Sequence, residues 1–414
     1  MWSRRKLVLV SISATALITA GLTACGNSED NATFAPAKTS RATVAITPES
    51  GAEKAPISTE IGITVTEGQV AQVEVTTDAG DQVSGDLRPD GSAWVPAEPL
   101  KPKTTYTATV EVLDDNKVPA TTSTSFTTMA KPKERMSATL WNKSGYEYGN
   151  AMPIMIDFPD DFEVPEKHRA EVEKRLFVYS DPPQQGAWHW FTGNHLEYRP
   201  EQFWEPGTSI SVRAALDGVP LGGDKYGEKD ITETVAIDSD TRVVEIVNKD
   251  KEMVAKKNGK VVKTMPISLG KASTPSYSGT MTIMEQMEHT VFDTTAECGG
   301  QVQGDNCYRT PVDWAQRLTW SGQFIHSAPW SVGDQGVRNV SHGCVNASPS
   351  DSKWIYDFAK IGDPVVITGT EEDLPYGDGF TAFDMSWEDF LQGSYLHKAK
   401  SNDDSKSDAS GEKN

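Results

Sequence analysis

Two histidines and a cysteine lie close together in the sequence and could carry out nucleophilic catalysis. His342 and Cys344 belong to the run Ser341-His342-Gly343-Cys344-Val345-Asn346, and His326 lies 18 positions before the cysteine (344 − 326). A cysteine attacks as its thiolate, and a nearby imidazole is the usual group that lowers its pKa. Gly343 leaves room for a substrate carbonyl and a backbone N–H that could face an oxyanion. For a Cys–His pair alone, a buried structural cysteine is the alternative.

The residues around this pair resemble the signature of the L,D-transpeptidases, penicillin-insensitive enzymes that cross-link bacterial cell walls. That signature is a histidine, a spacer of about fourteen to seventeen residues, Ser/Thr-His-Gly-Cys, a hydrophobic residue and asparagine. Here the spacer, Ser327 to Val340, has 14 residues (340 − 327 + 1), and every fixed position is matched. The resemblance extends to Tyr308-Arg309-Thr310 and Trp320-Ser321-Gly322. Residues 326–331 are similar to the mycobacterial and corynebacterial branch.

The resemblance implies a role for each residue of the motif. Cys344 would be the nucleophile and His326 the general base, with the backbone carbonyl of Ser327 holding the imidazole. The backbone N–H groups of residues 342–344 and the Tyr308 hydroxyl would form the oxyanion hole. The expected substrate-binding residues are Tyr308, Ser321, Gly322, His342, Gly343 and Asn346. Because side chains two positions apart on a strand share a face, Asn346 should face the same way as Cys344.

The implied donor substrate is a tetrapeptide stem of peptidoglycan. Cys344 would attack the carbonyl of the third residue, usually diaminopimelate, and release the terminal D-Ala. The thioester would then pass to the side-chain amine of diaminopimelate on a second stem, which cross-links two third residues. The resemblance implies no metal or other cofactor, and it implies that carbapenems acylate Cys344.

Other functions remain open on the sequence alone. An L,D-carboxypeptidase, or a cysteine peptidase or amidase that trims the wall, would use the same Cys–His chemistry with water as acceptor. In papain-like enzymes the cysteine precedes the histidine, whereas here His326 precedes Cys344, which argues against that class. The non-enzymatic alternative is a wall-binding lipoprotein with an inactive catalytic domain.

The N-terminus predicts export and lipid anchoring. Arg4, Arg5 and Lys6 precede a short apolar stretch that ends in Leu22-Thr23-Ala24-Cys25. This ending resembles the lipobox of bacterial lipoproteins, so Cys25 would carry the lipid and hold the protein on the outer face of the membrane, facing the wall. The net charge is −20, or −23 without those three cations (−20 − 3), which excludes an electrostatic footprint for nucleic acid.

The two remaining cysteines are candidates for a disulfide. Cys298 and Cys307 lie nine residues apart (307 − 298) in a glycine-rich segment just before Tyr308. An exported protein meets an oxidising environment, which favours pairing. Free thiols are the alternative, and so is a weak metal site, although two further ligands for zinc are lacking.

Strand-like patterns, eleven tryptophans and turn residues predict a mostly β protein, and we expect a monomer. The expected fold is two tandem immunoglobulin-like β-sandwiches, a β-rich L,D-transpeptidase catalytic domain with one or two helices, and a C-terminal aromatic segment. The expected divisions are a signal peptide with lipobox (1–25), a flexible tether (26–41), sandwich one (42–130), sandwich two (131–238), the catalytic domain (239–370), a C-terminal packing segment (371–398) and a disordered tail (399–414).

An internal repeat supports the two sandwiches. Ala93-Trp94-Val95-Pro96 corresponds to Glu197-Tyr198-Arg199-Pro200, and each is followed by an alternating strand. We interpret the repeated unit as a hairpin. Three tryptophans of the second unit could bind a ligand, but packing in the core is favoured because Trp dominates such cores; they are Trp188, Trp190 and Trp204.

The catalytic domain should open with a hairpin that joins Val243–Val247 to Gly259–Lys263, with its turn near Lys257-Asn258. A strand should end at His326, and a helix capped by Ser348 should run to Ala359. The aromatic segment from Leu374 to Leu396 should pack at the junction of the sandwich and the catalytic domain.

Overall fold

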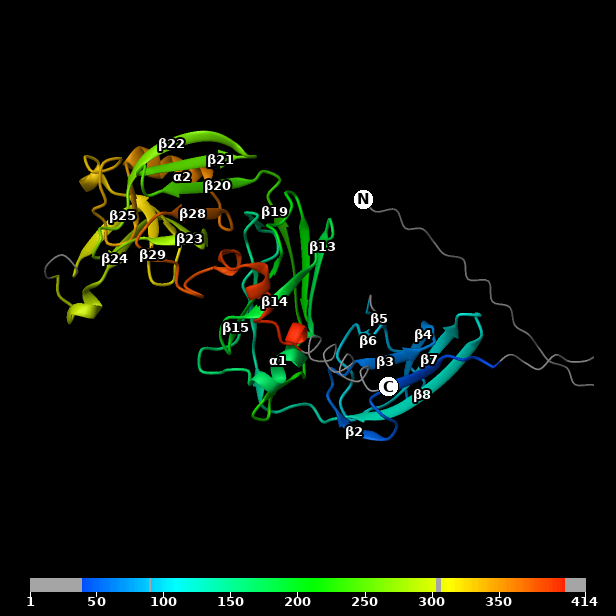
Figure 1. Ribbon diagram of the computed structural model, residues 1–414. Coiled ribbons are helices and arrows are strands. Elements are labelled where there is room, and N and C mark those ends of the chain that lie inside the picture. The colour runs from blue at the N-terminus through cyan, green and yellow to red at the C-terminus, as the bar shows by residue number, and fades with distance from the viewer. Residues whose placement is uncertain (1–38, 89–90, 303–306, 399–414) are drawn as a thin grey trace, which may run out of the picture.

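The computed structural model describes residues 39–88, 91–302 and 307–398. The predicted lipobox at Cys25, most of the tether and the tail after residue 398 lie outside the described residues. Strands dominate the described chain, so the mostly β prediction is confirmed (Figure 1). No helix among the described ranges is long and apolar enough to cross a membrane.

The first sandwich consists of two four-stranded sheets, ordered β1-β3-β6-β5 and β2-β8-β7-β4. The side chains of β7 alternate between buried and partly exposed, as expected for a strand with one face on the core. Trp94, Tyr106 and Phe126 lie in that core. The strands are β1 (Thr43–Thr47), β2 (Ala52–Ala55), β3 (Ile61–Thr66), β4 (Gly68–Thr77), β5 (Gly85–Leu87), β6 (Ala93–Pro96), β7 (Thr105–Asp114) and β8 (Pro119–Thr128).

The second sandwich has the same plan, with sheets ordered β10-β12-β15-β14 and β11-β19-β16-β13 and a small sheet β17-β18-β9. The strands are β9 (Arg135–Met136), β10 (Thr139–Leu140), β11 (Glu147–Tyr148), β12 (Ile154–Asp157), β13 (Leu176–Asp181), β14 (Gly186–Trp190), β15 (His195–Pro200), β16 (Ser209–Ala214), β17 (Pro220–Gly222), β18 (Lys225–Gly227) and β19 (Ile231–Ile237). Helix α1 (Glu166–Glu173) precedes β13.

The repeat in the sequence is confirmed, but its interpretation as a hairpin is wrong. β6 and β15 occupy equivalent places in one sheet, and β7 and β16 occupy equivalent places in the other. The repeated segment therefore crosses between sheets and does not fold back within one. The expected core packing is also found, since Trp188, Trp190 and Trp204 are all buried in the second sandwich.

The catalytic domain is built on a ten-stranded sheet ordered β24-β25-β26-β27-β22-β21-β20-β28-β23-β29. The predicted first hairpin is wrong, because β21 was not anticipated and lies between the two segments that we expected to pair. The strands are β20 (Arg242–Val247), β21 (Glu252–Lys257), β22 (Lys260–Ser268), β23 (Tyr277–Thr282), β24 (Glu285–Asp293), β25 (Arg309–Arg317), β26 (Phe324–Ser327), β27 (Val345–Ala347), β28 (Pro364–Thr368) and β29 (Glu372–Asp373).

The predicted helix is present as α2 (Pro349–Phe358), and the Ser348 side chain caps it by accepting from the Asp351 N–H at 3.1 Å. The C-terminal segment contains α3 (Trp387–Leu391) and packs where we expected. Arg199 of the second sandwich stacks on Phe390, and Asp384 accepts from the Thr280 N–H of the catalytic sheet. The part of the chain that the structure describes also contains three short 3-10 helices: η1 (Thr295–Cys298), η2 (Pro329–Ser331) and η3 (Ala382–Asp384).

Candidate active site

Two adjacent parallel strands, β26 and β27, bring the motif residues together. His326 on β26 is the register partner of Asn346 on β27, and Cys344 directly precedes β27. Opposite positions in a parallel pair face the same side, so these three side chains point into one pocket. The pocket has a volume of about 360 Å³ and is lined by Phe292, Tyr308, Thr310, Val312, His326, Trp330, Val340, Ser341, His342, Cys344 and Asn346.

The His326 imidazole is fixed in one tautomer. Its Nδ1 donates to the backbone carbonyl of Ser327 at 2.9 Å, so its Nε2 carries no proton when the ring is neutral. The ring packs edge-on against Phe292, with centroids 5.1 Å apart, and lies 6.0 Å from Trp330. Burial lowers the pKa of His326 to about 4, so the imidazole is neutral near pH 7.

Cys344 is a neutral thiol in this conformation. Its Sγ donates to the Gly322 carbonyl at 3.7 Å, and among the described residues it makes no hydrogen bond to His326. The side chain is partly exposed but packs against an apolar cluster that includes Phe292 and Phe324. Burial raises the pKa of Cys344 to about 12, and a hydrogen bond from the Phe324 backbone opposes the rise. The expectation that the imidazole lowers this pKa is therefore wrong for the resting site.

The loop before the nucleophile is held by two serines. Ser341 Oγ donates to the Cys344 carbonyl at 2.6 Å and accepts from the Gly343 N–H at 3.2 Å. Ser276 Oγ donates to the Gly343 carbonyl at 2.7 Å. Gly343 has φ +116°, a conformation that favours glycine, which explains its place in the motif. The Gly343 N–H, which we expected in the oxyanion hole, is therefore engaged within the loop.

His342 and Tyr308 lie together on the rim of the pocket, with ring centroids 5.7 Å apart. Nε2 of His342 lies 3.1 Å from Nζ of Lys271. A lysine ammonium only donates, so this imidazole nitrogen is the acceptor of the bond. Lys271 thus adds a cation to the rim that the sequence analysis missed.

Three of the expected substrate-binding residues do not line the pocket: Ser321, Gly322 and Gly343. Ser321 does not line the pocket, because its N–H and its hydroxyl both bind Asp378. Gly322 contributes only its backbone carbonyl, which accepts the hydrogen bond from the Cys344 thiol. Asn346 does line the pocket, and its Nδ2 donates to Ser331 Oγ at 3.1 Å.

Cys307 is disulfide-bonded and precedes Tyr308 on the wall of the pocket. The side chain of Cys298, at the end of η1, lies outside what the structure describes, so the Cys298–Cys307 pairing stays a prediction. The sequence analysis also missed Ser276 and Phe292. They lie on segments 68 and 52 residues before Cys344 (344 − 276 and 344 − 292), and nothing in their local sequence marks them.

A cysteine and a tautomer-fixed histidine in one pocket, on strands of a β-rich domain, define a class of protein, the cysteine-dependent acyl-transfer enzymes. Residues 241–367 match the family model of the L,D-transpeptidase catalytic domain, and residues 52–220 match that of a bacterial Ig domain. The chain belongs to the L,D-transpeptidase family.

Two relatives in sequence support this assignment along most of the chain. L,D-transpeptidase 2 of Mycobacterium tuberculosis is 32% identical over 400 residues, which cover 94% of this chain and 95% of the relative. L,D-transpeptidase 5 of the same species is 31% identical, covering 78% of this chain and 70% of the relative. A solved structure of the L,D-transpeptidase LdtMt1 in complex with imipenem is 30% identical, with a TM-score of 0.48 over 57% of this chain and 100% of that one. The chain is thus an acyltransferase with the activity of its family.

Proposed function

We propose that Cys344 and His326 transfer an acyl group between two peptidoglycan stem peptides. The observation that carries this proposal is the Nδ1 bond of His326 to Ser327, which leaves Nε2 as a base in the same pocket as the Cys344 thiol. Because both groups rest in their neutral forms, the proton moves to Nε2 as the sulfur attacks, and no stable ion pair precedes the attack.

In the first half-reaction the sulfur bonds to the carbonyl carbon of the third stem residue. The tetrahedral intermediate collapses to a thioester, and the terminal D-Ala leaves as its amine takes the proton from His326. In the second half-reaction an amine from another stem attacks the thioester, and His326 accepts the amine proton and returns it to the sulfur. One peptide bond replaces another, so no external energy source is needed. The pocket must exclude water, and its apolar wall of Phe292, Val312 and Trp330 supports that requirement.

The rim supplies the groups for substrate recognition. Tyr308 and His342 border the pocket, and the Lys271 ammonium group donates a hydrogen bond to His342. Stem peptides carry carboxylates, which a rim cation attracts. We assign Tyr308, His342, Lys271 and Asn346 to substrate contact, and Ser341 and Gly343 to the shape of the loop that presents Cys344. Carbapenems, which acylate nucleophiles of this kind, should form a covalent adduct with Cys344, in line with the imipenem complex of LdtMt1.

The localisation follows from the sequence motif at the N-terminus. The family acts on the cell wall, so the protein works outside the cytoplasm. We propose that Cys25 carries a lipid that anchors a monomer to the outer face of the membrane. We also propose the domain boundaries 42–130, 131–238, 239–370 and 371–398, with which the sheet assignments of the structure are compatible. The two sandwiches would then hold the catalytic pocket away from the membrane.

The direct test is incubation of the purified protein with a disaccharide-tetrapeptide, followed by mass spectrometry of the products. A dimer that has lost one D-Ala, absent with Cys344→Ala, is the expected result. A monomeric tripeptide as the sole product would show that water is the acceptor and would replace the transferase by a carboxypeptidase. Product formation by Cys344→Ala would overturn the assigned nucleophile.

A further inference from the structure

The carbonyl that accepts the hydrogen bond from the Cys344 thiol lies in a short turn, residues 319–322, between β25 and β26. Gly322 adopts φ +100°, a backbone conformation that favours glycine. Its N–H donates to the Thr319 carbonyl at 3.3 Å, which closes the turn. The direction of the Gly322 carbonyl, and with it the orientation of the sulfur, therefore depends on how this turn is held.

One side of the turn is fixed by Gln323, which is only 8% exposed. Its side-chain amide donates to the Pro275 carbonyl at 3.3 Å and accepts from the Tyr277 N–H at 3.1 Å. The other side of the turn faces solvent, because Trp320 is 45% exposed and Ser321 is also exposed. An exposed turn opens readily unless a further contact anchors it.

The anchor on the exposed side is Asp378, which belongs to the C-terminal segment. Its Oδ1 accepts from the Ser321 N–H at 2.7 Å, and its Oδ2 accepts from the Ser321 hydroxyl. Two bonds from one residue to one carboxylate fix both the place and the rotation of that residue, and such bonds are stronger than those to a neutral acceptor. Beside Ser321, the Trp320 ring packs edge-on against Phe380 with centroids 5.7 Å apart. Residues 378–380 thus hold the side of the turn that Gln323 does not reach.

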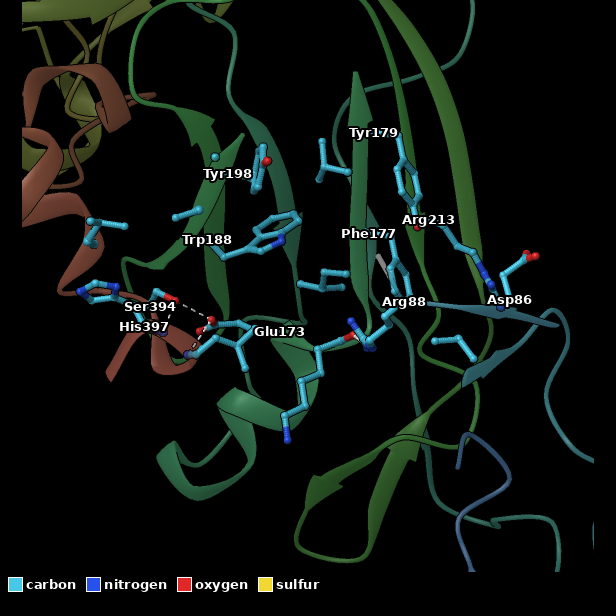
Figure 2. Close-up of a pocket in the computed structure, with 18 of the residues that line it drawn as sticks. Asp86, Arg88, Glu173, Phe177, Tyr179, Trp188, Tyr198, Arg213, Ser394 and His397 are labelled. Carbon is cyan, nitrogen blue, oxygen red and sulfur yellow. Dashed lines mark hydrogen bonds between the residues drawn. The ribbon is translucent and has the colours of Figure 1, made fainter. Parts of the chain in front are cut away.

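The segment around Asp378 is itself firmly supported. Phe380 is 1% exposed and belongs to the apolar core of the second sandwich. Gly379 packs so closely that a Cβ there would lie 2.8 Å from a backbone carbonyl just after β25. Further along the segment, Ser394 Oγ donates to Glu173 of α1 at 2.8 Å (Figure 2). These contacts keep the Asp378 carboxylate in a fixed place, as a group that orients a neighbouring site requires.

We propose that Asp378 is a positioning residue for acyl transfer. By binding Ser321 it sets the direction of the Gly322 carbonyl, and this carbonyl limits the rotation of the Cys344 side chain. The sulfur is then presented to the substrate carbonyl in one orientation, which raises the fraction of bound substrate that is attacked. Asp378 does not line the catalytic pocket, so it acts through the turn. The assignment rests on the proposed function, because it takes Cys344 as the nucleophile.

The test measures the acylation of Cys344 by imipenem in the full-length protein, by mass spectrometry at several imipenem concentrations. Asp378→Ala removes both acceptor oxygens, and its maximal acylation rate should fall about tenfold, because a misplaced nucleophile attacks more slowly. The imipenem concentration that gives half of the maximal rate should not change, since Asp378 does not line the pocket. Asp378→Asn keeps one carbonyl oxygen and should restore part of the rate.

Further variants show whether the effect passes through Ser321. Ser321→Ala keeps the N–H bond to Asp378 and should lose only part of the rate. The double variant Ser321→Ala/Asp378→Ala should be no slower than Asp378→Ala, because two residues that act through one contact are not additive. Asp373→Ala is the matched control, since it removes an exposed carboxylate of the same segment, and its rate should equal that of the wild type.

Alkylation by iodoacetamide separates positioning from a loss of structure. If Asp378→Ala opened the site, the burial that raises the pKa of Cys344 would be lost, and alkylation at pH 7 would accelerate. Slower acylation together with an unchanged alkylation rate supports the proposal. An unchanged maximal acylation rate, faster alkylation or an additive double variant would overturn it. A wild-type protein that is acylated but forms no cross-link would contradict the proposed transfer between stems, while slower acylation of Asp378→Ala would still support the positioning role.

Discussion

The thiol of Cys344 and the carbonyl of Gly322 are joined by a hydrogen bond of 3.7 Å, which holds the nucleophile in its protonated form. The same sulfur packs against Phe292 and Phe324, and that burial raises the pKa of Cys344 to about 12. His326 stands in the same pocket with its pKa lowered to about 4. In this conformation both groups therefore favour their neutral forms, and this preference can be tested.

Alkylation of Cys344 by iodoacetamide should rise about tenfold per pH unit from pH 7 to 10, because the thiolate fraction does so below a pKa of about 12. A thiolate–imidazolium pair would instead give a plateau near neutral pH. Peptide mass spectrometry at each pH measures the rate. His326→Gln should keep the same slope, and a plateau that this variant abolishes would contradict the neutral resting pair.

Acid should destabilise the catalytic domain through His326. The pKa of this residue is lowered in the folded state, so its contribution is complete above the unfolded pKa of about 6.5 and is lost as the pH falls through about 4. The difference corresponds to about 3 kcal/mol of unfolding free energy. Denaturant midpoints between pH 7.5 and 4 should therefore fall more steeply for the wild type than for His326→Gln. Parallel curves for the two proteins would argue against a buried neutral imidazole.

Much of the active site could be predicted because its signals are local in sequence. The motif placed Cys344 and Asn346 two residues apart on one face, and the structure puts both in the pocket. The strand that ends near His326 and the Ser348 cap of α2 were likewise visible in short windows. The sandwich repeat was also predictable, because equivalent strands carry equivalent residues.

The features of the fold and the site that could not be predicted depend on contacts between segments that lie far apart in the sequence. Ser276 reaches the Gly343 carbonyl from 67 residues away, and Ser321 turns to Asp378 because of a loop 57 residues later. The pKa of Cys344 depends on phenylalanines from other strands, so a motif alone gave the wrong direction. β21 was missed because Glu252–Lys257 is short and only half of its residues are apolar, so its two neighbours in the sheet make it a strand.

Removal of the predicted lipid site should release the protein from the membrane. With Cys25→Ala, no acyl chain can be attached, and the net charge of the chain offers no electrostatic attraction to anionic lipid. Membrane and soluble fractions of cells that produce each version, probed with an antibody, report the change. Cys344→Ala is the control, since it should stay with the membrane. Retention of Cys25→Ala in the membrane fraction would argue for a different anchor.

Glu173 should control whether the C-terminal segment stays docked on the second sandwich. Its carboxylate accepts from Trp190 Nε1, from Ser394 Oγ at 2.8 Å and from the N–H groups of Tyr395 and Leu396 at 2.7 and 3.1 Å. In Glu173→Gln an amide NH2 faces donors that it cannot satisfy, so the free energy of unfolding should fall by about 2 kcal/mol.

Hydrogen exchange at backbone amides shows which part of the protein is destabilised by Glu173→Gln. Exchange at Tyr395 or Leu396 should accelerate in Glu173→Gln, because an NH2 group replaces one of the two carboxylate oxygens that accept from these N–H groups. Exchange should not change in Glu166→Gln, which alters a carboxylate in the first turn of the same helix. Unchanged exchange at these two amides would show that other contacts, such as the stacking of Arg199 on Phe390, hold the segment without Glu173.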